Sequence, residues 1–556
     1  MTRPPKSIPG AAWPYRGAVP DSRAHGHPPD VLTRLAERLA GRRFGLERAT
    51  TRYRISRRLP VPMRDGVQLL ADHYAPVTST PAGTLLLRGP YTRDALPTRV
   101  VLGLYAARGY HVVLQSTRGS FGSGGVFEPG HGEVEDGVDT VDWLRRQPWF
   151  TGTFATVGGS YLGFTQLALL ADPQPELATA VVTMGPHDIG RAAWGTGTFA
   201  LSDFLTWGYQ MAWHERGGFF RQLVRTVLTP RRLEPAFGQL PLSAAADAVM
   251  GGGSPFYESW LDNADPSGDY WRRRAVAFEA AQQPVLLIGG WQDLFFDQTM
   301  AQFLKLRDNG VAVALVIGPW THGEGGGVAI RESLDWLAGR RRSEPVRIFV
   351  TGDGGWRDLP DWPPPSTATV LHPLPGAVLA DAPAVADTRL SFVYDPADPT
   401  PTIGGRLLLA AAAGYRDDGA LARRSDALTF TGPERVADLE VIGVPYVELG
   451  HAIDTPTADV AVRLSDVDPN GRSQNVSDGY ASVGSEPSET LRIEFDPIAH
   501  RFRAGHRIRL TIAGGSFPRF ARNLGTGEPV ATGAEFVRST HVLDCARSTL
   551  VLPRVS

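Results

Sequence analysis

The sequence predicts an α/β domain with a mostly parallel sheet, an inserted helical cap and a C-terminal β-sandwich of the jelly-roll type. From residue 54 onward, short apolar runs alternate with helical stretches, which is typical of a parallel sheet covered by helices on both faces. About a hundred residues after position 184 have few strand signals and many aromatic side chains. After residue 345 the helical periodicity disappears and short alternating segments replace it. At roughly 150 residues per domain, a chain of 556 residues accommodates these parts.

The first 50 residues are expected to form a basic extension that is partly disordered or helical. Residues 1–58 carry 13 Lys or Arg against 4 Asp or Glu. Asp30 is a candidate N-cap for a helix in which leucines share one face and arginines lie beside them. These side chains are Leu32, Leu35, Leu39, Arg34, Arg38 and Arg42. Such a helix can lie on a membrane or bind a partner, but a stripe of only about three turns favours packing on its own protein.

The α/β domain is predicted at 51–187 and 284–345. Its strands are short, apolar and bounded by turn residues, and its helices have apolar side chains on one side. The expected strands are 84–87, 111–115, 154–158, 284–289 and 311–317, and the expected helices are 133–146 and 162–171.

The remaining parts are a cap at 188–283 and a jelly-roll domain at 346–556. The cap is expected to be a helical insertion over the edge of the sheet. In the C-terminal part, segments 346–350, 460–464 and 507–512 alternate between apolar and polar residues and are separated by Pro, Gly and Asp turns. This pattern predicts antiparallel strands.

Composition excludes several classes of protein. A formal charge of −2 lacks the electrostatic signature of a nucleic-acid binder, so no nucleic-acid partner is expected. The single cysteine, Cys545, cannot form an intramolecular disulfide, and no Cys/His cluster has the spacing of zinc ligands, so no metal is expected. No apolar run approaches the roughly 18 residues of a membrane span, and no apolar signal-peptide core is present. These observations lead us to expect a soluble, cytoplasmic protein.

The sharpest local motif is GGSYLG at 158–163, between an apolar strand and a helical segment. A nucleophilic serine needs a tight strand-to-helix turn that lifts its hydroxyl above the sheet, and flanking glycines permit that turn. The helix N-terminus behind it offers backbone N–H groups to a developing oxyanion. The second glycine comes one position later than in the usual G-x-S-x-G pattern, so a turn without chemistry stays open at this point. Ser160 is nevertheless a candidate nucleophile.

A base and an orienting acid follow Ser160 in the order that a hydrolase sheet requires, acid before histidine. The strand at 284–289 leads to Asp293, and the strand at 311–317 leads to His322. Open parallel sheets bind their ligands at such carboxyl ends. Asp297 is a rival for the acid, but it lies four residues further on, in an expected helix. The three candidates therefore follow three strand ends in the order Ser160, Asp293, His322.

These motifs resemble those of the CocE/NonD hydrolases, the group of cocaine esterase, α-amino-acid ester hydrolases and X-Pro dipeptidyl peptidases. The resemblance rests on GGSYLG at 158–163, GWQD at 290–293 and GPWTH at 318–322. It is supported by VPMRDGV at 61–67, RGPY at 88–91 and SFPRF at 516–520, and it extends from about residue 54 to the end. The displaced glycine fits because G-x-S-Y-x-G is the variant of this family. The resemblance implies an α/β-hydrolase fold for the first domain.

It also implies a mechanism and its residues. Ser160 would attack an acyl carbonyl, His322 would take the serine proton, and Asp293 would hold His322 in the required tautomer. The oxyanion would be held by the Tyr161 backbone N–H and the Tyr91 hydroxyl. The expected activity is hydrolysis of a carboxylic ester or amide through an acyl-enzyme.

By spacing, Trp194, Trp207 and Phe295 resemble positions that line the acyl pocket, although aromatic residues in an apolar insertion also serve as plain core. The implied partner is a small-molecule acyl substrate, and the implied reaction requires neither cofactor nor metal. A homodimer stays open, because dimers are common among similar proteins.

Two alternatives remain at this point. The same acyl-enzyme could pass its acyl group to an amine, an alcohol or an internal nucleophile, which would make the protein an acyltransferase or cyclase. In the other alternative, the hydrolase site is inactive and the jelly roll binds a carbohydrate. Occupation of all three triad positions argues against the second of these.

Overall fold

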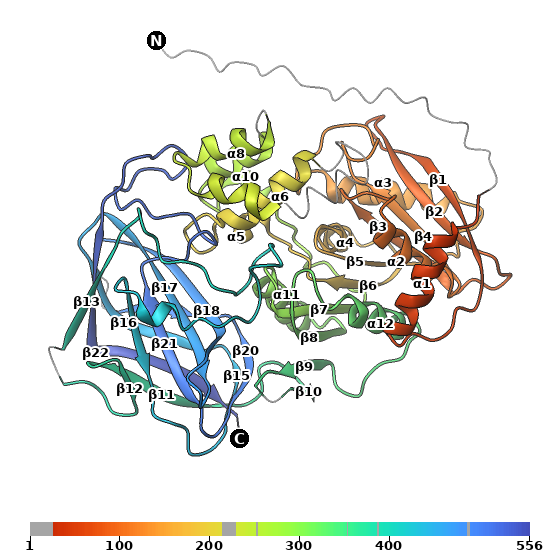
Figure 1. Ribbon diagram of the computed structural model, residues 1–556. Coiled ribbons are helices and arrows are strands. Elements are labelled where there is room, and N and C mark those ends of the chain that lie inside the picture. Colours follow the sequence, from red (N-terminus) through yellow and green to blue (C-terminus); the bar gives the residue numbers. More distant parts are fainter. Residues whose placement is uncertain are drawn as a thin grey trace, which may run out of the picture.

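The computed structural model describes residues 26–213, 229–251, 254–352, 354–385, 388–485 and 490–555. Figure 1 shows an α/β domain beside a β-sandwich, with a group of helices above and between them. Residues 1–25 of the predicted N-terminal extension and residues 214–228 of the predicted cap lie outside the described ranges.

The α/β domain is built on a sheet of ten strands in the order β1-β2-β4-β3-β5-β6-β7-β8-β9-β10. Strands β3 to β9 run parallel to one another, while β1, β2 and β10 pair antiparallel at the two edges. The strands are β1 (Tyr53–Pro62), β2 (Gln68–Pro76), β3 (Gly83–Gly89), β4 (Tyr110–Ser116), β5 (Phe154–Gly159), β6 (Leu177–Thr183), β7 (Val285–Gln292), β8 (Val313–Thr321), β9 (Val346–Val350) and β10 (Gly355–Leu359). The near-continuous apolar runs of the central strands reflect burial on both faces.

Helices cover both faces of this sheet. Apolar side chains of α3, α4 and α11 pack into one cluster, and those of α2 and α12 pack into another, with alternate residues of the strands between them. The helices are α2 (Leu96–Ala106), α3 (Glu133–Arg145), α4 (Tyr161–Ala171), α11 (Phe296–Asp308) and α12 (Gly326–Leu337).

The boundary expected at residue 346 is displaced by two strands. The alternating segment 346–350 was expected in the sandwich, but β9 pairs in parallel with β8 and β10 closes the α/β sheet. The alternation of apolar and polar residues correctly predicted a strand here, but it could not predict which sheet the strand joins. Burial on one side occurs in a sandwich and also near the edge of a mixed sheet.

The inserted segment between β6 and β7 is helical, as expected. Its described helices are α5 (Ile189–Trp194), α6 (Leu201–Trp213), α8 (Leu242–Met250), α9 (Pro255–Asp262) and α10 (Asp269–Arg272). Large aromatic side chains fill its interior, and Trp260, Trp271 and Tyr257 are fully buried. Aromatic side chains bury a large apolar area each, so a few of them stabilise these short helices.

The C-terminal part is a β-sandwich with its own apolar core, which includes Cys545. All its strand pairs are antiparallel except a single bridge between β12 and β14. The strands are β11 (Thr367–Leu374), β12 (Val378–Ala380), β13 (Arg389–Tyr394), β14 (Ala427–Thr431), β15 (Leu439–Gly443), β16 (Tyr446–Ile453), β17 (Thr457–Val467), β18 (Ser473–Gly484), β19 (Leu491–Glu494), β20 (Ile498–Phe502), β21 (Arg507–Ala513) and β22 (Ser539–Arg554), and a 3₁₀ turn, η1, spans Leu421–Arg423.

Buried polar contacts join the sandwich to the rest of the molecule. Arg406, in the loop between β13 and β14, forms ion pairs with Asp297 of α11 at 3.0 Å and with Asp496 of the sandwich at 2.7 Å. The backbone N–H of Leu408 donates to Asp203 of α6 at 2.8 Å. The loop between β13 and β14 is therefore fixed against both the α/β domain and the cap.

Helix α1 (Val31–Arg43) begins where the sequence predicts, because Asp30 accepts the Thr33 backbone N–H at 2.8 Å. Its packing face is not the predicted one. Thr33 and Gly41 are buried, and Glu37 accepts a hydrogen bond from Tyr53 of β1, so the leucine stripe faces outward. Helix α1 packs on its own protein, as expected, but it does so through its small and polar side and not through the leucine stripe.

Candidate active site

Ser160 occupies the turn between β5 and α4. Its backbone has φ 58° and ψ −128°, a conformation that residues with a side chain rarely adopt. Its N–H donates to the carbonyl of Thr183 on the neighbouring strand β6 at 3.0 Å, which holds the strained turn. Strain of this kind costs on the order of 1–3 kcal/mol and persists where the surroundings enforce it. The turn exposes the hydroxyl at the carboxyl end of the sheet.

The displaced glycine of the motif has a steric reason. Gly163, in the first turn of α4, faces Gly185, and a Cβ on Gly163 would lie 2.6 Å from the Gly185 Cα. Helix α4 can therefore approach the loop after β6 only because both positions lack a side chain. In this chain, close packing requires the glycine three residues after Ser160.

Asp293 and His322 follow the neighbouring parallel strands β7 and β8 and meet at the same edge. The Nδ1 atom of His322 lies 2.6 Å from Oδ2 of Asp293, and the Asp293 side chain is fully buried. The other Asp293 oxygen accepts the Phe295 backbone N–H at 2.9 Å. The rival Asp297 instead pairs with Arg191 and Arg406. Of the two acids, Asp293 is the one hydrogen-bonded to His322.

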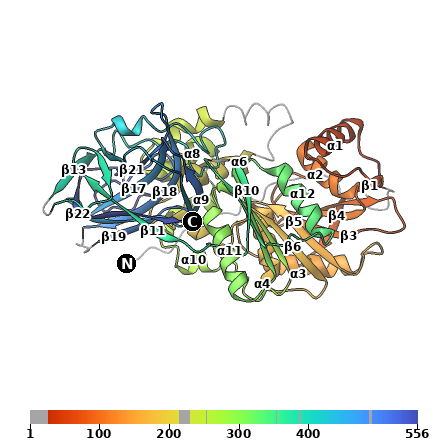
Figure 2. The ribbon, with the colours of Figure 1, turned by 90° about the horizontal axis from the view of Figure 1, so that it is seen from below.

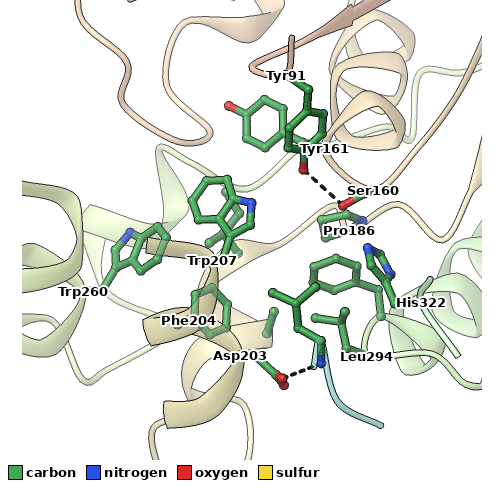
Figure 3. Close-up of a pocket in the computed structure, with 14 residues that line it drawn as sticks. Tyr91, Ser160, Tyr161, Pro186, Asp203, Phe204, Trp207, Trp260, Leu294 and His322 are labelled. Atoms are coloured by element: carbon green, nitrogen blue, oxygen red, sulfur yellow. Dashed lines mark hydrogen bonds between the residues drawn. The ribbon is translucent and has the colours of Figure 1, made fainter. Parts of the chain in front are cut away.

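Tyr91, in the loop after β3, points its hydroxyl at Ser160. The two oxygens are 3.4 Å apart, and a dashed line marks this hydrogen bond in Figure 3. Burial raises the pKa of Tyr91, and hydrogen bonds that involve Ser160, Trp207 and the Tyr161 backbone oppose this rise. The Tyr91 phenol therefore stays protonated at neutral pH and can donate a hydrogen bond at the mouth of the turn.

A buried network of hydrogen bonds connects the Tyr161 hydroxyl with the segment that leads to Tyr91. The Tyr161 hydroxyl donates to Oε1 of Glu133 at 2.9 Å and accepts the Gly130 backbone N–H at 2.9 Å. Arg88, three residues before Tyr91, donates to Oε2 of Glu133 at 2.9 Å and to Oε1 of Gln115 at 2.8 Å. The side chains of Arg88 and Glu133 are only 2% and 5% exposed. This ion pair ties the Tyr91 loop to the residue that follows Ser160.

These groups open on an apolar pocket with an empty volume of about 510 Å³. Figure 3 shows His322 and Ser160 at one end of it, with aromatic side chains of the cap across from them. The lining residues are Tyr91, Ser160, Tyr161, Pro186, Ile189, Ala192, Asp203, Phe204, Trp207, Trp260, Leu294, Phe295, His322 and Leu408.

Two of the three residues expected to line an acyl pocket reach it. Trp207 and Phe295 are lining residues, but Trp194 is not among them. The Trp194 indole N–H donates to the Trp260 carbonyl at 2.9 Å, and its ring packs against Phe199 inside the cap. Trp194 is a core residue of the cap, because its ring is buried among other cap residues and is absent from the described pocket lining.

Asp203 is the only acidic residue among the described residues that line the pocket. Its carboxylate is directed toward the Leu408 backbone N–H, as Figure 3 shows. Burial raises the pKa of Asp203 to about 6, and the hydrogen bond from Leu408 and the charge of Arg519 oppose this rise. Near neutral pH the pocket wall therefore carries one buried carboxylate that is already hydrogen-bonded.

Sequence reasoning missed Glu133, Asp203 and Leu408. Glu133 is difficult to recognise as a site residue from sequence. An acid in the first turn of a helix interacts favourably with the helix dipole, and this alone explains its presence. Asp203 sits in an apolar, aromatic helix, where a lone carboxylate points to a special environment. Leu408 comes from a loop of the sandwich and gives no local signal at all.

In the ranges that the structure describes, no three His, Cys, Asp or Glu side chains come together as metal ligands. The helices in those same ranges are too short or too polar to cross a membrane.

Two family models match the chain in succession. Residues 65–324 match the X-Pro dipeptidyl-peptidase (S15 family) model, and residues 338–551 match the model of the X-Pro dipeptidyl-peptidase C-terminal non-catalytic domain. Cocaine esterase from Rhodococcus sp. strain MB1 Bresler is 29% identical over 555 residues, which cover 86% of this chain and 94% of the esterase. The catalytic part of the chain thus matches the S15 family, and the chain is a serine hydrolase that is similar to the CocE/NonD hydrolases.

Solved structures share the fold of this serine hydrolase. An α-amino acid ester hydrolase superimposes with a TM-score of 0.77 at 21% identity, covering 92% of this chain and 98% of that one. A CocE/NonD family hydrolase from Staphylococcus aureus gives a TM-score of 0.65 at 16% identity, covering 91% and 94%. The α/β-hydrolase fold with its C-terminal β domain is thereby confirmed.

Glu133→Gln tests the buried network beneath the pocket. The substitution leaves Arg88 buried without a counter-charge, so we expect a loss of about 3–5 kcal/mol in the free energy of unfolding and a fall in turnover. Urea unfolding and ester hydrolysis measure the two effects. Glu135→Gln, an exposed position in the same helix turn, is the control and should cost less than about 0.5 kcal/mol. Equal stability of the two variants would contradict the role of the ion pair.

Asp203→Asn tests the buried carboxylate. The folded-state pKa of Asp203 lies above its ordinary 3.8, so the stability that its protonated form contributes is lost as the pH rises from about 4 through about 6. The amide keeps an acceptor for the Leu408 N–H and removes the charge. We expect the variant to exceed the wild type by up to about 3 kcal/mol in free energy of unfolding near pH 8, and to match it near pH 4.

Urea unfolding at several pH values measures this difference for Asp203→Asn. Asp247→Asn, at an exposed position of α8, is the matched control and should follow the wild type at every pH. A constant difference between Asp203→Asn and the wild type across the range would contradict the assignment.

Proposed function

We propose that the protein hydrolyses carboxylic esters with a neutral, apolar acyl group through an acyl-enzyme on Ser160. The observation that carries the proposal is the convergence of Ser160 and His322 on one apolar pocket, with His322 hydrogen-bonded to the buried Asp293 at 2.6 Å. A serine, a histidine and a buried acid in this arrangement form the general solution for acyl transfer at a serine hydroxyl.

In the proposed first step, Ser160 Oγ attacks the ester carbonyl carbon. His322 takes the serine proton through Nε2, because Nδ1 carries the proton donated to Asp293. The imidazolium formed in this step is stabilised by the Asp293 carboxylate and then protonates the leaving alcohol. Water deacylates the enzyme by the same route in reverse, with His322 again as the base.

The negative charge that develops on the carbonyl oxygen needs donors that are already in place. The Tyr161 backbone N–H lies at the N-terminus of α4, where the helix dipole favours negative charge. The Tyr91 hydroxyl lies 3.4 Å from Ser160 Oγ, on the side of the cap. Both donors are held by the Arg88–Glu133 pair, so they need little reorganisation as the charge forms.

The residues of the pocket wall favour one class of acyl group over others. Aromatic surface suits an aryl or branched aliphatic group, and here it comes from Phe204, Trp207 and Phe295. An acyl group with a free α-ammonium would need a carboxylate facing it, and the only acid among the described lining residues, Asp203, is engaged by Leu408. This argues for neutral acyl groups over amino-acyl and X-Pro substrates.

Two alternatives considered from the sequence receive no support from the comparisons. The relative with 29% identity is named as an esterase, and neither matching family is one of acyltransferases or carbohydrate-binding proteins. Water is therefore the proposed acceptor of the acyl group.

Ser160→Ala tests the proposed nucleophile. A panel of short aliphatic esters, aryl esters and X-Pro anilides should give turnover of aryl esters by the wild type, little turnover of the anilides, and loss of all activity in the variant. A fluorophosphonate probe should label the wild type and not Ser160→Ala. Ester hydrolysis that survives the substitution would contradict the mechanism, and preferred cleavage of X-Pro anilides would contradict the substrate class.

Tyr91→Phe tests the proposed oxyanion donor. One such donor contributes about 3 kcal/mol to transition-state stabilisation, so kcat should fall roughly a hundred-fold while thermal stability changes little. Tyr257→Phe, at a fully buried tyrosine of the cap that does not line the pocket, is the matched control and should keep its turnover. An unchanged kcat in Tyr91→Phe would remove this hydroxyl from the reaction.

A further inference from the structure

The outward side of α1 combines exposed aliphatic and basic side chains. Val31, Leu32, Leu35 and Leu39 are 71%, 59%, 53% and 58% exposed. Four arginines on the same side of the helix are exposed as well. This set, which we name the α1 outer face, consists of Val31, Leu32, Arg34, Leu35, Arg38, Leu39, Arg42 and Arg43.

The leucines are not needed to hold α1 in place. The inner side does that through buried Thr33 and Gly41, and through the Glu37 carboxylate that accepts a hydrogen bond from Tyr53. Asp30 caps the helix and pairs with Arg99 of α2 at 2.5 Å. A helix that is already fixed by its polar and small residues has no folding reason to carry a stripe of large apolar side chains toward solvent.

The charge on this face has one sign. The single acid within the helix, Glu37, is turned inward toward Tyr53. Within the described part of the chain, none of the four arginines of the α1 outer face takes part in an ion pair. The face therefore presents guanidinium groups that flank an apolar stripe, and of the four only Arg34 lies close enough to Glu37 to lower the pKa of that carboxyl.

The one-sided charge decides among the candidates that could cover the face. A second copy of the chain would bring arginines against arginines across a two-fold axis, which is repulsive. Residues 1–25 carry four basic side chains and one acidic side chain, so they have the same sign as the face. An anionic bilayer satisfies both components, because phosphates accept from arginines while aliphatic side chains enter the region between headgroups and acyl chains.

The position of α1 leaves it accessible to a flat surface. In both Figure 1 and Figure 2, α1 lies at the end of the molecule opposite the β-sandwich, on the outside of the α/β domain. We propose that the α1 outer face docks the protein reversibly on an anionic lipid surface, with the helix axis in the plane of the interface. Three turns of helix bury too little apolar area for permanent anchoring, so binding depends on the arginines and weakens with salt.

Vesicle co-sedimentation with the full chain tests the proposal. The protein should bind vesicles of phosphatidylcholine containing about one third phosphatidylglycerol, release them as salt is raised, and bind pure phosphatidylcholine weakly. Leu35→Glu with Leu39→Glu should abolish binding. Arg38→Gln with Arg42→Gln should weaken it roughly 25-fold, at about five-fold for each arginine.

Matched controls separate this surface from folding and from catalysis. Val436→Glu, at a 97% exposed position of the sandwich, should bind vesicles like the wild type. All variants should keep the wild-type melting temperature and the wild-type rate of ester hydrolysis in solution, since the substituted side chains are exposed. Vesicle binding by Ser160→Ala should also be unchanged, so failure of the proposed esterase function would leave this test intact.

Three outcomes would overturn the proposal. The first is absence of binding to anionic vesicles at low salt. The second is equal binding by the wild type and the Leu35→Glu, Leu39→Glu variant. The third is an oligomer in analytical ultracentrifugation that the same variant converts to monomers while vesicles remain unbound, which would assign the face to a contact between copies of the chain.

Discussion

The buried ion pair between Arg88 and Glu133 is the constraint on which the geometry around Ser160 depends. Arg88 belongs to β3, which leads to Tyr91, and Glu133 begins α3 and accepts the Tyr161 hydroxyl. An ion pair of this kind tolerates no loss of one partner, because the other would remain charged in an apolar interior. It therefore fixes the spacing between the Tyr91 loop and the turn at Ser160, which are about seventy residues apart in sequence. Their two donors face the serine as a consequence.

The parallel sheet and the sandwich both contribute residues to the pocket. The sheet brings Ser160, Asp293 and His322 together, because the carboxyl ends of parallel strands share one edge. The sandwich contributes through one loop, in which Arg406 pairs with Asp297 and Leu408 both lines the pocket and binds Asp203. The β domain therefore contributes to the wall of the pocket.

Local sequence signals predicted some features well and others poorly. Ser160, Asp293 and His322 were predicted because each follows an apolar strand in a glycine-rich or aromatic turn, and the structure brings the three to one edge of the sheet. Trp194 was assigned to the pocket on spacing alone, although Trp194 and Trp207 have the same residue type and differ only in the direction that their helices give them. The boundary at 346 failed for a similar reason, since alternation says nothing about which sheet a strand joins.

The sequence by itself determined the order of domains, the strand-to-helix turn at Ser160, the strand-end positions of Asp293 and His322, and the N-cap of α1 at Asp30. These depend on contacts within a few residues, which local patterns record. Only the tertiary structure decided that Glu133 holds Tyr161, that Leu408 closes the pocket and that α1 turns its leucines toward solvent. Those outcomes depend on which distant segments meet, and no periodicity or motif contains that information.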